Sequence, residues 1–257
     1  MMNREIDLSV TAYGVARNLD YNLAILPWGA TEPHNLHLPY MTDCLLSQAV
    51  AVDAAERALK NYGKRAMVLP PVPMGAQNPG QRDLKFCIHY CYETQQAILR
   101  DIVRSLHHQG IRRLLIVNGH GGNSFKSMIR DLAVDYPDFI IAASEWFKMA
   151  PAKEFFDDPG DHADELETSV MMHYHPELVN LAEAGQGKSK GFAIDALAKG
   201  KVWIPRHWTL VTSDTGIGNP AAATPEKGAR FANAVADAYA SFINDFANIN
   251  QLSDLYQ

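Results

Sequence analysis

The residues best suited to chemistry fall in two short stretches of the sequence. Glu32, His34 and Asp43 lie within EPHNLHLPYMTD, and His120 lies within VNGHGGN. Each stretch directly follows an apolar run that is typical of a buried strand. Carboxylates and neutral imidazoles that converge from rigid elements are the ligands of divalent cations that activate water. Together, the two stretches predict a metal site.

The spacing of these residues favours the same interpretation. Glu32 and His34 are two residues apart, so in an extended chain both side chains project to the same side. Asp43 stands at the predicted start of a helix, where the helix dipole favours a carboxylate, and in a metal cluster it could bridge two ions. Taken singly, Asp43 could be only an N-cap, and His34 or His37 only a loop histidine. The set as a whole favours the metal site.

Four motifs in a fixed order resemble one known family. EPHNLHLP followed by TD, then NGHGGN, then HADELETS, is similar to the series found in the creatininase (creatinine amidohydrolase) family. Near the C-terminus, GNPAAATPEKG is similar to the turn that leads into the final helix of that family. Each motif is short, but the series runs along most of the chain.

The resemblance implies a fold, an activity and a ligand set. It implies a three-layer α/β/α fold with a mostly parallel central sheet, and a homo-oligomer that could be a ring-like hexamer. It implies a hydrolase with two divalent metal ions per chain, acting on C–N bonds of cyclic or linear amides other than peptide bonds. Glu32, His34, Asp43 and His120 match the family's metal ligands, with Asp43 in the bridging place, and His162 matches a histidine near the substrate.

One ligand of the creatinine-hydrolysing members is missing from this sequence. Those members carry a glutamate two residues beyond the position of His120, where this chain has Gly122. Another carboxylate must then complete the coordination of the second ion. Glu167 is the first choice for this ligand and Glu165 the second. A helix predicted over residues 164–174 places these two glutamates about 200° apart, so only one of them can face a shared site.

The expected pocket segments differ most from the family. Pro33 and Asn35 flank His34 where Gln and Gly are usual, and GAQNPGQRDLKFCIHYC replaces a serine followed by a Phe-Pro-Gly-Thr stretch. The substrate therefore stays open, and creatinine is not expected. We predict substrate contacts from Gly121 and Gly122, whose missing side chains permit close approach of the backbone, and from Trp146 at a predicted strand end. The glycines of NGHGGN do not fit a G-x-G-x-x-G phosphate loop.

The mechanism that follows is a hypothesis. Two ions bridged by Asp43 would lower the pKa of a bound hydroxide, which attacks an amide carbonyl. His162 would pass the proton to the leaving nitrogen, a role that suits imidazole near neutral pH. The nitrogen and oxygen ligand set is compatible with zinc, manganese or iron, of which we expect zinc.

Three other functions use the same residues differently. A deformylase acting on a formamide attached to a heterocycle would need the same site. A metallophosphatase would need cations to hold phosphate, and Arg82, Lys85 and Arg206 are the nearest choices in the sequence. A noncatalytic binding or assembly protein could retain the fold, but the presence of all four matching ligands disfavours it.

Composition narrows the class of protein. The 257 residues are 47% apolar, which is enough for one core, so we expect a single domain over 1–257. Lys and Arg number 23 against 29 Asp and Glu, and the basic residues are scattered, so nucleic acid is not an expected partner. No stretch is apolar enough for a signal peptide or a membrane span, which predicts a cytoplasmic protein.

The elements that must position the site alternate between short apolar runs and amphipathic segments, as in βα units around a parallel sheet. We predict strands over 22–29, 111–120 and 139–147, and residues 65–75 predict another strand that runs into a proline-rich loop. We predict helices over 43–61, 92–109, 124–135 and 164–174, the second helix ending at Gly110. Ligands of open α/β sheets gather outside the carboxyl ends of the strands. Glu32 and His120 both fall there.

Overall fold

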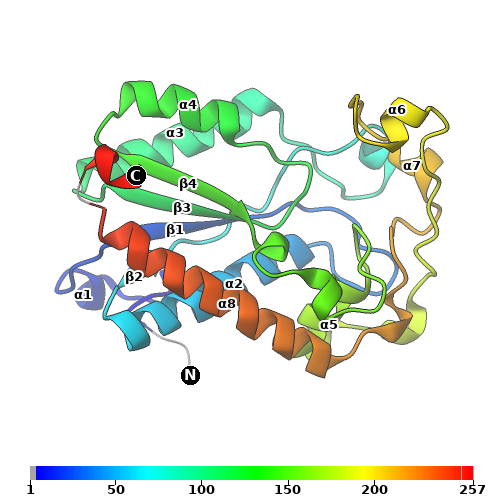
Figure 1. Cartoon of the computed structure of the whole chain (residues 1–257), viewed down its shortest axis with the longest axis horizontal. Coiled ribbons are helices and arrows are strands. Elements are labelled where there is room, and N and C mark those ends of the chain that lie inside the picture. Colours follow the sequence, from blue (N-terminus) through cyan, green and yellow to red (C-terminus); the bar gives the residue numbers. More distant parts are fainter. Residues whose placement is uncertain (1–3, 250, 257) are drawn as a thin grey trace.

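The sheet that positions the candidate ligands has four parallel strands. The computed structural model describes residues 4–249 and 251–256. Along the sheet the order is β2 (Ala66–Val68), β1 (Leu23–Trp28), β3 (Arg113–Asn118) and β4 (Ile140–Glu145), and every neighbouring pair is parallel (Figure 1). All four predicted strands exist. The prediction of an α/β fold with a mostly parallel sheet is therefore confirmed.

The strands are apolar on both sides because both faces of the sheet are covered. In β1, Leu23 and Ile25 belong to one core, while Ala24, Leu26 and Trp28 belong to the other. Alternate side chains of a strand point to opposite faces, so a run such as LAILPW can be buried without interruption. The two cores fill the spaces between the sheet and the two helix layers.

Helices cover each face of the sheet and make the predicted three-layer architecture (Figure 1). One core packs α2 (Thr42–Tyr62), α5 (Glu165–Tyr174) and α8 (Pro225–Ala247) against the sheet. The other core packs α3 (Tyr92–His108) and α4 (Lys126–Asp135). The bounds of the four predicted helices lie within two residues of the predicted ones, and Gly110 follows the end of α3 with a φ of 87°.

The sequence predicts an apolar stripe along α2, and the buried face is rotated from it. The predicted stripe consists of Leu45, Leu46, Ala49, Val50 and Val52. Leu46 and Val50 are buried as expected, but Leu45 and Val52 are only half-buried. Small residues such as Ala54 take their place in the core, because α8 and the sheet pack closely against α2. At the first turn the rotation also buries Asp43, which lies inside the helix. Met41 is the N-cap residue, so the alternative of Asp43 as an N-cap was wrong.

The chain connections that follow β1 and β3 diverge to opposite faces of the sheet. The chain leaves β1 through α2 on one face of the sheet, whereas it leaves β3 through α4 on the other face. Loops that diverge in this way open a space outside the carboxyl ends of two neighbouring strands, which is where open α/β sheets bind ligands. The loops that carry Glu32 and His120 flank this space.

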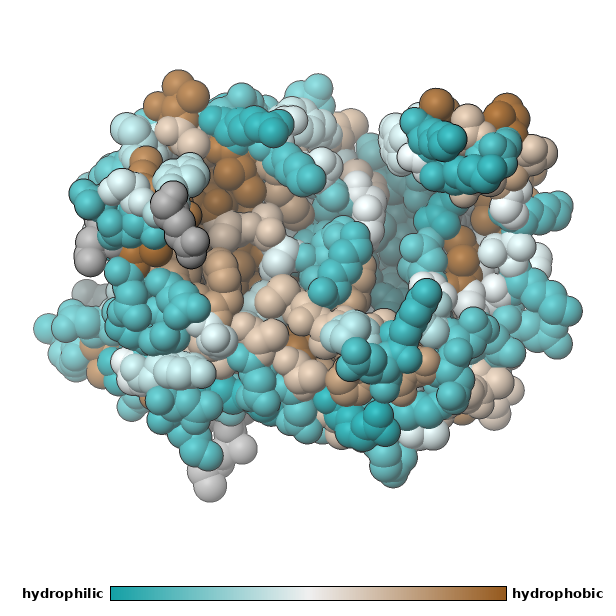
Figure 2. Space-filling view, in the orientation of Figure 1, coloured by the Kyte–Doolittle hydropathy of each residue, from teal (hydrophilic) through white to brown (hydrophobic). Residues whose placement is uncertain are grey.

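A long irregular segment, residues 176–224, lies beyond the carboxyl ends of the strands (Figure 1). Figure 2 shows that the part around α6 stands away from the body of the molecule, and that hydrophilic side chains line the hollow between them. The short helices of the described chain are α1 (Tyr13–Ala16), η1 (Gln81–Asp83), η2 (Trp146–Lys148), η3 (Ala152–Glu154), η4 (Pro176–Leu178), η5 (Leu181–Glu183), α6 (Asp195–Ala198), α7 (Trp208–Val211), η6 (Pro220–Ala222) and η7 (Leu252–Leu255).

The structure tests the expectation about membrane spans but not the expectation of a single domain. Among the residues that the structure describes, no helix has the length and apolar character needed to cross a membrane. The expectation of a single domain over 1–257 stays a prediction.

Candidate metal centre

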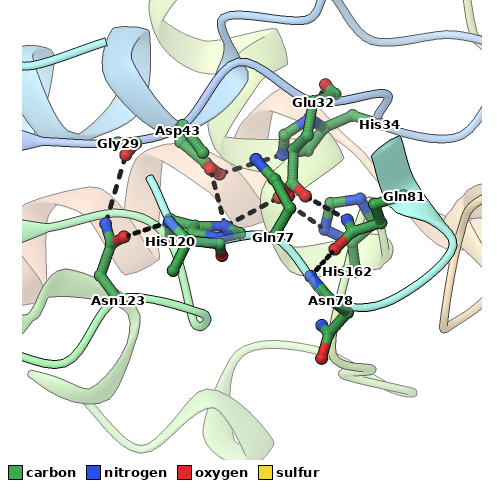
Figure 3. Close-up of polar contacts among 12 residues, drawn as sticks. Gly29, Glu32, His34, Asp43, Gln77, Asn78, Gln81, His120, Asn123 and His162 are labelled. Carbon is green, nitrogen blue, oxygen red and sulfur yellow. Dashed lines mark hydrogen bonds and ion pairs between the residues drawn. The ribbon is translucent and has the colours of Figure 1, made fainter. Parts of the chain in front are cut away.

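Six side chains from four separate segments meet at the carboxyl end of the sheet, and Figure 3 labels all of them except Glu167. The loop after β1, the first turn of α2, the loop after β3 and the start of α5 all contribute. Each of the six is at most 8% exposed. They are Glu32, His34, Asp43, His120, His162 and Glu167. The structure thus brings together the candidate ligands and the candidate catalytic histidine.

The six residues form three overlapping groups that could each hold a metal ion. The groups are Glu32 with Asp43 and His120, His34 with Asp43 and Glu167, and Glu32 with His34 and His162. Within each group the ligand atoms lie within 4.8 Å of one another. Because the groups share members, the cluster can accommodate more than one cation.

Asp43 connects the two groups to which it belongs. Its Oδ1 lies 3.0 Å from Nε2 of His34, and its Oδ2 lies 3.2 Å from Nδ1 of His120. Oδ2 is buried, and its ion-pair contact with His120 does not have the geometry of a hydrogen bond. A buried carboxylate that directs one oxygen to each histidine, with one oxygen unsatisfied, has the arrangement of a ligand that bridges two ions.

Backbone carbonyl groups orient the three histidines. Nδ1 of His34 donates to the Glu32 carbonyl at 3.0 Å, and Nε2 of His162 donates to the Pro33 carbonyl at 2.9 Å. Nε2 of His120 donates to the Ala76 carbonyl at 2.7 Å. Since a carbonyl oxygen can only accept, each of these nitrogens must carry a proton. The other nitrogen of each ring is left facing the carboxylates, as in metal-binding histidines whose second nitrogen is hydrogen-bonded. The donor set therefore fits divalent cations.

In the absence of cations, protons on two histidines balance the carboxylates. Burial alone would raise the pKa values of Glu32 and Asp43, but the neighbouring histidines outweigh it and hold both below their ordinary values. Burial alone would lower the pKa of His34, but Asp43 raises it to about 10. Glu32 and Asp43 likewise outweigh burial and hold the pKa of His120 well above its ordinary value. In the described chain, only histidines form ion pairs with these two carboxylates.

Two members of the cluster differ electrostatically from the rest. Burial raises the pKa of Glu167 to about 8, and its Oε2 accepts a hydrogen bond from the Ala163 backbone at 2.5 Å. Burial and the nearby His34 lower the pKa of His162 below its ordinary value. At neutral pH the His162 ring is therefore neutral. Its Nδ1, 3.7 Å from Oε1 of Glu32, is free to accept a proton.

The two candidate glutamates of α5 point to different surroundings, as the helical spacing predicts. Glu167 faces His34 and Asp43. Glu165 is fully buried elsewhere, where Nζ of Lys227 lies 2.5 Å from Oε1 and the Asp158 backbone donates to Oε2 at 2.8 Å. Glu165 is therefore engaged by a cation of α8 and is not among the groups that could hold an ion.

The predicted pocket residues have three different environments. A Cβ atom on Gly122 would lie 2.5 Å from Nε2 of His120 and would also collide with the Ala76 carbonyl, so only glycine fits. Gly121 is exposed, and a Cβ there would meet nothing within 4 Å. Trp146 is fully buried among core aromatic rings, with Phe231 at 6.2 Å between ring centroids. The structure therefore does not bring Trp146 to the cluster.

Sequence reasoning missed three amide side chains beside the cluster. Nε2 of Gln81 donates to Oε2 of Glu32 at 2.5 Å. Nε2 of Gln77 donates to the Ile88 carbonyl at 3.4 Å, and its buried Oε1 accepts no hydrogen bond within the described chain. Oδ1 of Asn123 accepts from the Ala76 backbone at 3.1 Å. The available signal was the unusual GAQNPGQRD segment, which carries both glutamines. The segment does not indicate which of its side chains point toward the cluster.

A parallel α/β fold with a buried carboxylate and histidine cluster at its strand ends is the architecture of a metal-dependent amidohydrolase. The chain belongs to the creatininase family, because the family model described as creatinine amidohydrolase matches residues 10–243.

Curated relatives include proteins with different stated substrates. A mycofactocin precursor peptide peptidase from Mycobacterium ulcerans is 30% identical over 223 residues, covering 83% of this chain and 81% of the relative. A creatinine amidohydrolase from Pseudomonas putida is 28% identical over 184 residues, covering 61% of this chain and 66% of the relative. Family membership therefore does not specify the substrate.

Solved structures agree with the fold. The structure of a candidate creatinine amidohydrolase from Bacteroides fragilis is 59% identical, covers 100% of both chains and has a TM-score of 0.96. A manganese creatininase structure is 22% identical with a TM-score of 0.77, covering 95% of this chain and all of the other. A mutant creatininase of the Zn–Zn type is also 22% identical, with a TM-score of 0.75. At this identity the last two show the fold alone.

Proposed function

We propose that this protein is a dinuclear metal-dependent amidohydrolase that cleaves a C–N bond of an amide. The observation that carries the proposal is the position of Asp43, which directs one carboxylate oxygen to each of two histidines. Glu32, Asp43 and His120 would hold one ion, and His34, Asp43 and Glu167 the other. The two protonated histidines of the cation-free cluster would lose their protons when the ions bind.

The ligand chemistry restricts the metal. The set contains only carboxylate oxygens and imidazole nitrogens, which suits zinc, manganese or iron. Once bound, two such ions would activate a water molecule and polarise the substrate carbonyl. We expect zinc, and solved relatives of the family with Zn–Zn or Mn in their descriptions support this range.

His162 is the proposed proton carrier. Its ring is neutral at neutral pH, and the Pro33 carbonyl holds its Nε2–H, so Nδ1 is the atom that can take up a proton. In the proposed reaction the water oxygen bonds to the amide carbon and the C–N bond breaks. The proton lost from water passes through Nδ1 of His162 to the leaving nitrogen. A metal-binding role is the alternative, because His162 also lies in a possible ligand group with Glu32 and His34.

The substrate class is an amide, cyclic or linear. Because one relative is a peptidase, we include peptide bonds among the candidates, as well as formamides attached to heterocycles. A phosphate ester is a weaker candidate: Asp161 engages Arg206 at 2.6 Å, and Arg82 and Lys85 are both exposed. A small-molecule substrate, a homo-oligomeric assembly and the absence of nucleic-acid partners stay predictions.

The deciding experiment is metal content followed by an activity screen. Mass spectrometry of protein purified without chelator should give about two equivalents of zinc, manganese or iron per chain. Asp43→Ala should lose most of this metal, whereas Asp101→Ala, an exposed residue of α3, should not. The loaded enzyme would then be screened against creatinine, lactams, formamides and short peptides. If no metal binds even after addition of these ions, the proposal is wrong and a noncatalytic binding or assembly protein takes its place.

A further inference from the structure

Gln81 belongs to a part of the chain that does not carry any candidate ligand, yet it contacts one. Its side chain is 1% exposed and lies in η1, and Nε2 donates to Oε2 of Glu32 at 2.5 Å (Figure 3). Oε1 of Glu32 lies 2.9 Å from Nδ1 of His120. The two oxygens of Glu32 therefore have different partners.

We propose that Gln81 is a positioning residue that holds Glu32 as a one-oxygen metal ligand. This inference rests on the proposed function, because it takes the cluster to be a metal site. With Oε2 bound to the Gln81 amide, Oε1 is the oxygen left to coordinate an ion. Carboxylate ligands in metal sites are commonly oriented by a hydrogen bond to the oxygen that does not bind.

The chemistry of glutamine suits this task. A lysine or arginine beside Glu32 would also donate, but its charge would compete with the metal for the carboxylate. An amide orients the carboxylate and leaves its negative charge available. Because both residues are almost fully buried, the hydrogen bond is protected from exchange with water.

The opposite end of the Gln81 amide is held by its own loop. The backbone of Asn78 donates to Oε1 of Gln81 at 2.6 Å, so both ends of the amide are occupied. Gly80 precedes η1 with a φ of 84°, a conformation that favours glycine, and a Cβ there would lie 2.8 Å from the His207 ring. The conformation of the loop is therefore constrained, and the Gln81 side chain has little freedom to turn away from Glu32.

The irregular segment 176–224 supports the same loop. The backbone of Trp208 donates to the Pro79 carbonyl at 2.7 Å. The Trp208 ring also packs edge-on against His162, with 5.3 Å between ring centroids. One residue of this segment thus fixes both the loop that carries Gln81 and the proposed proton carrier.

The test compares metal affinity in two matched variants. Gln81→Met keeps the length and neutrality of the side chain but removes both the donor to Glu32 and the acceptor for the Asn78 backbone. Gln96→Met is the control, because Gln96 also donates to a carboxylate, that of Asp131 at 2.9 Å, but at the exposed surface. Zinc would be titrated into the full-length metal-free protein against a competing chelator. We expect Gln81→Met to weaken one of the two binding steps by about 10- to 100-fold and to leave the other step unchanged.

The outcomes separate this inference from the proposed function. Two unaltered binding steps in Gln81→Met would overturn the positioning role while leaving the metal site intact. If the wild-type protein binds no zinc, both the site and the role of Gln81 are wrong. Thermal unfolding of the metal-free variants shows whether Gln81→Met is folded. If it is not, Gln81→Asn, which keeps the amide but is too short to reach Glu32, should show the same loss at one step.

Discussion

Nε2 of His120 donates a hydrogen bond to the carbonyl oxygen of Ala76, 2.7 Å away, and this contact joins two loops that are distant in sequence. It leaves Nδ1 of His120 facing the carboxylates of Glu32 and Asp43. Ala76 is held in turn, because its backbone N–H donates to Oδ1 of Asn123. The orientation of a candidate ligand therefore depends on an asparagine three residues further along the same motif.

Replacement of Asn123 should weaken metal binding without removing a ligand. Asn123→Ala leaves the Ala76 N–H without its partner and loosens the carbonyl that orients His120. We expect metal affinity to fall by about 10- to 100-fold, as measured by chelator competition. Ser124→Ala, at the exposed neighbouring position, should bind metal as the wild type does. Equal affinity in the two variants would contradict this account.

Replacement of each glutamate of α5 with glutamine should have a different effect on metal content and stability. Glu167→Gln removes a candidate ligand of the second ion, so metal content should fall from about two equivalents to about one. Glu165→Gln removes the partner of Lys227 and should lower the thermal unfolding midpoint while retaining both ions. Mass spectrometry and thermal unfolding of both variants check this prediction, and a loss of metal in Glu165→Gln alone would reverse the assignment.

Metal uptake should depend on pH through Glu167. Burial raises the pKa of its carboxyl group to about 8 in the metal-free protein, so at pH 7 the group carries a proton that the ion must displace. Affinity for this ion should therefore rise with pH through about 8, and His34, whose pKa is about 10, should extend the rise to higher pH. Calorimetry in buffers of different ionisation enthalpy would detect the released proton. In Glu167→Gln the part of the pH dependence near pH 8 should disappear, whereas loss of the His120 proton should still accompany the remaining binding step.

A side chain at position 122 should not be tolerated. Gly122→Ala places a methyl group against His120 and the Ala76 carbonyl, which we expect to lower the free energy of unfolding by about 1–3 kcal/mol and to weaken metal binding. Gly121→Ala has open space and should change stability by less than about 0.5 kcal/mol. Denaturant unfolding of both proteins tests the difference. Equal stability would mean that the loop shifts to accommodate a side chain.

Replacement of His162 separates its two possible roles. If it carries a proton, His162→Ala should lose turnover of any substrate found in the screen and keep both ions. If it is a ligand, metal content should fall together with turnover. His173→Ala, on the exposed side of α5, provides the control for replacing a histidine in this region. Metal analysis alone decides between the roles.

Much of the fold, and the identity of most candidate ligands, could be predicted from local sequence patterns. Uninterrupted apolar runs such as LAILPW indicate strands covered on both faces, and the amphipathic segments between them indicate helices of a parallel α/β fold. Because parallel strands place their carboxyl ends at one edge, the sequence predicts that Glu32 and His120 meet. Helical spacing likewise separates Glu165 from Glu167, since that relationship depends only on residues within one helix.

Tertiary structure decided what local patterns leave open. Which of the two glutamates faces the site depends on how α5 is rotated against α2 and α8, and the core packing of Trp146 depends on the same layer. Gln81 reaches Glu32 across 49 residues of sequence, from a loop without regular periodicity. Such contacts arise from the packing of irregular segments, which follow no repeating pattern. The sequence by itself therefore determined the layers and the candidate ligands, and the fold determined which side chains orient them.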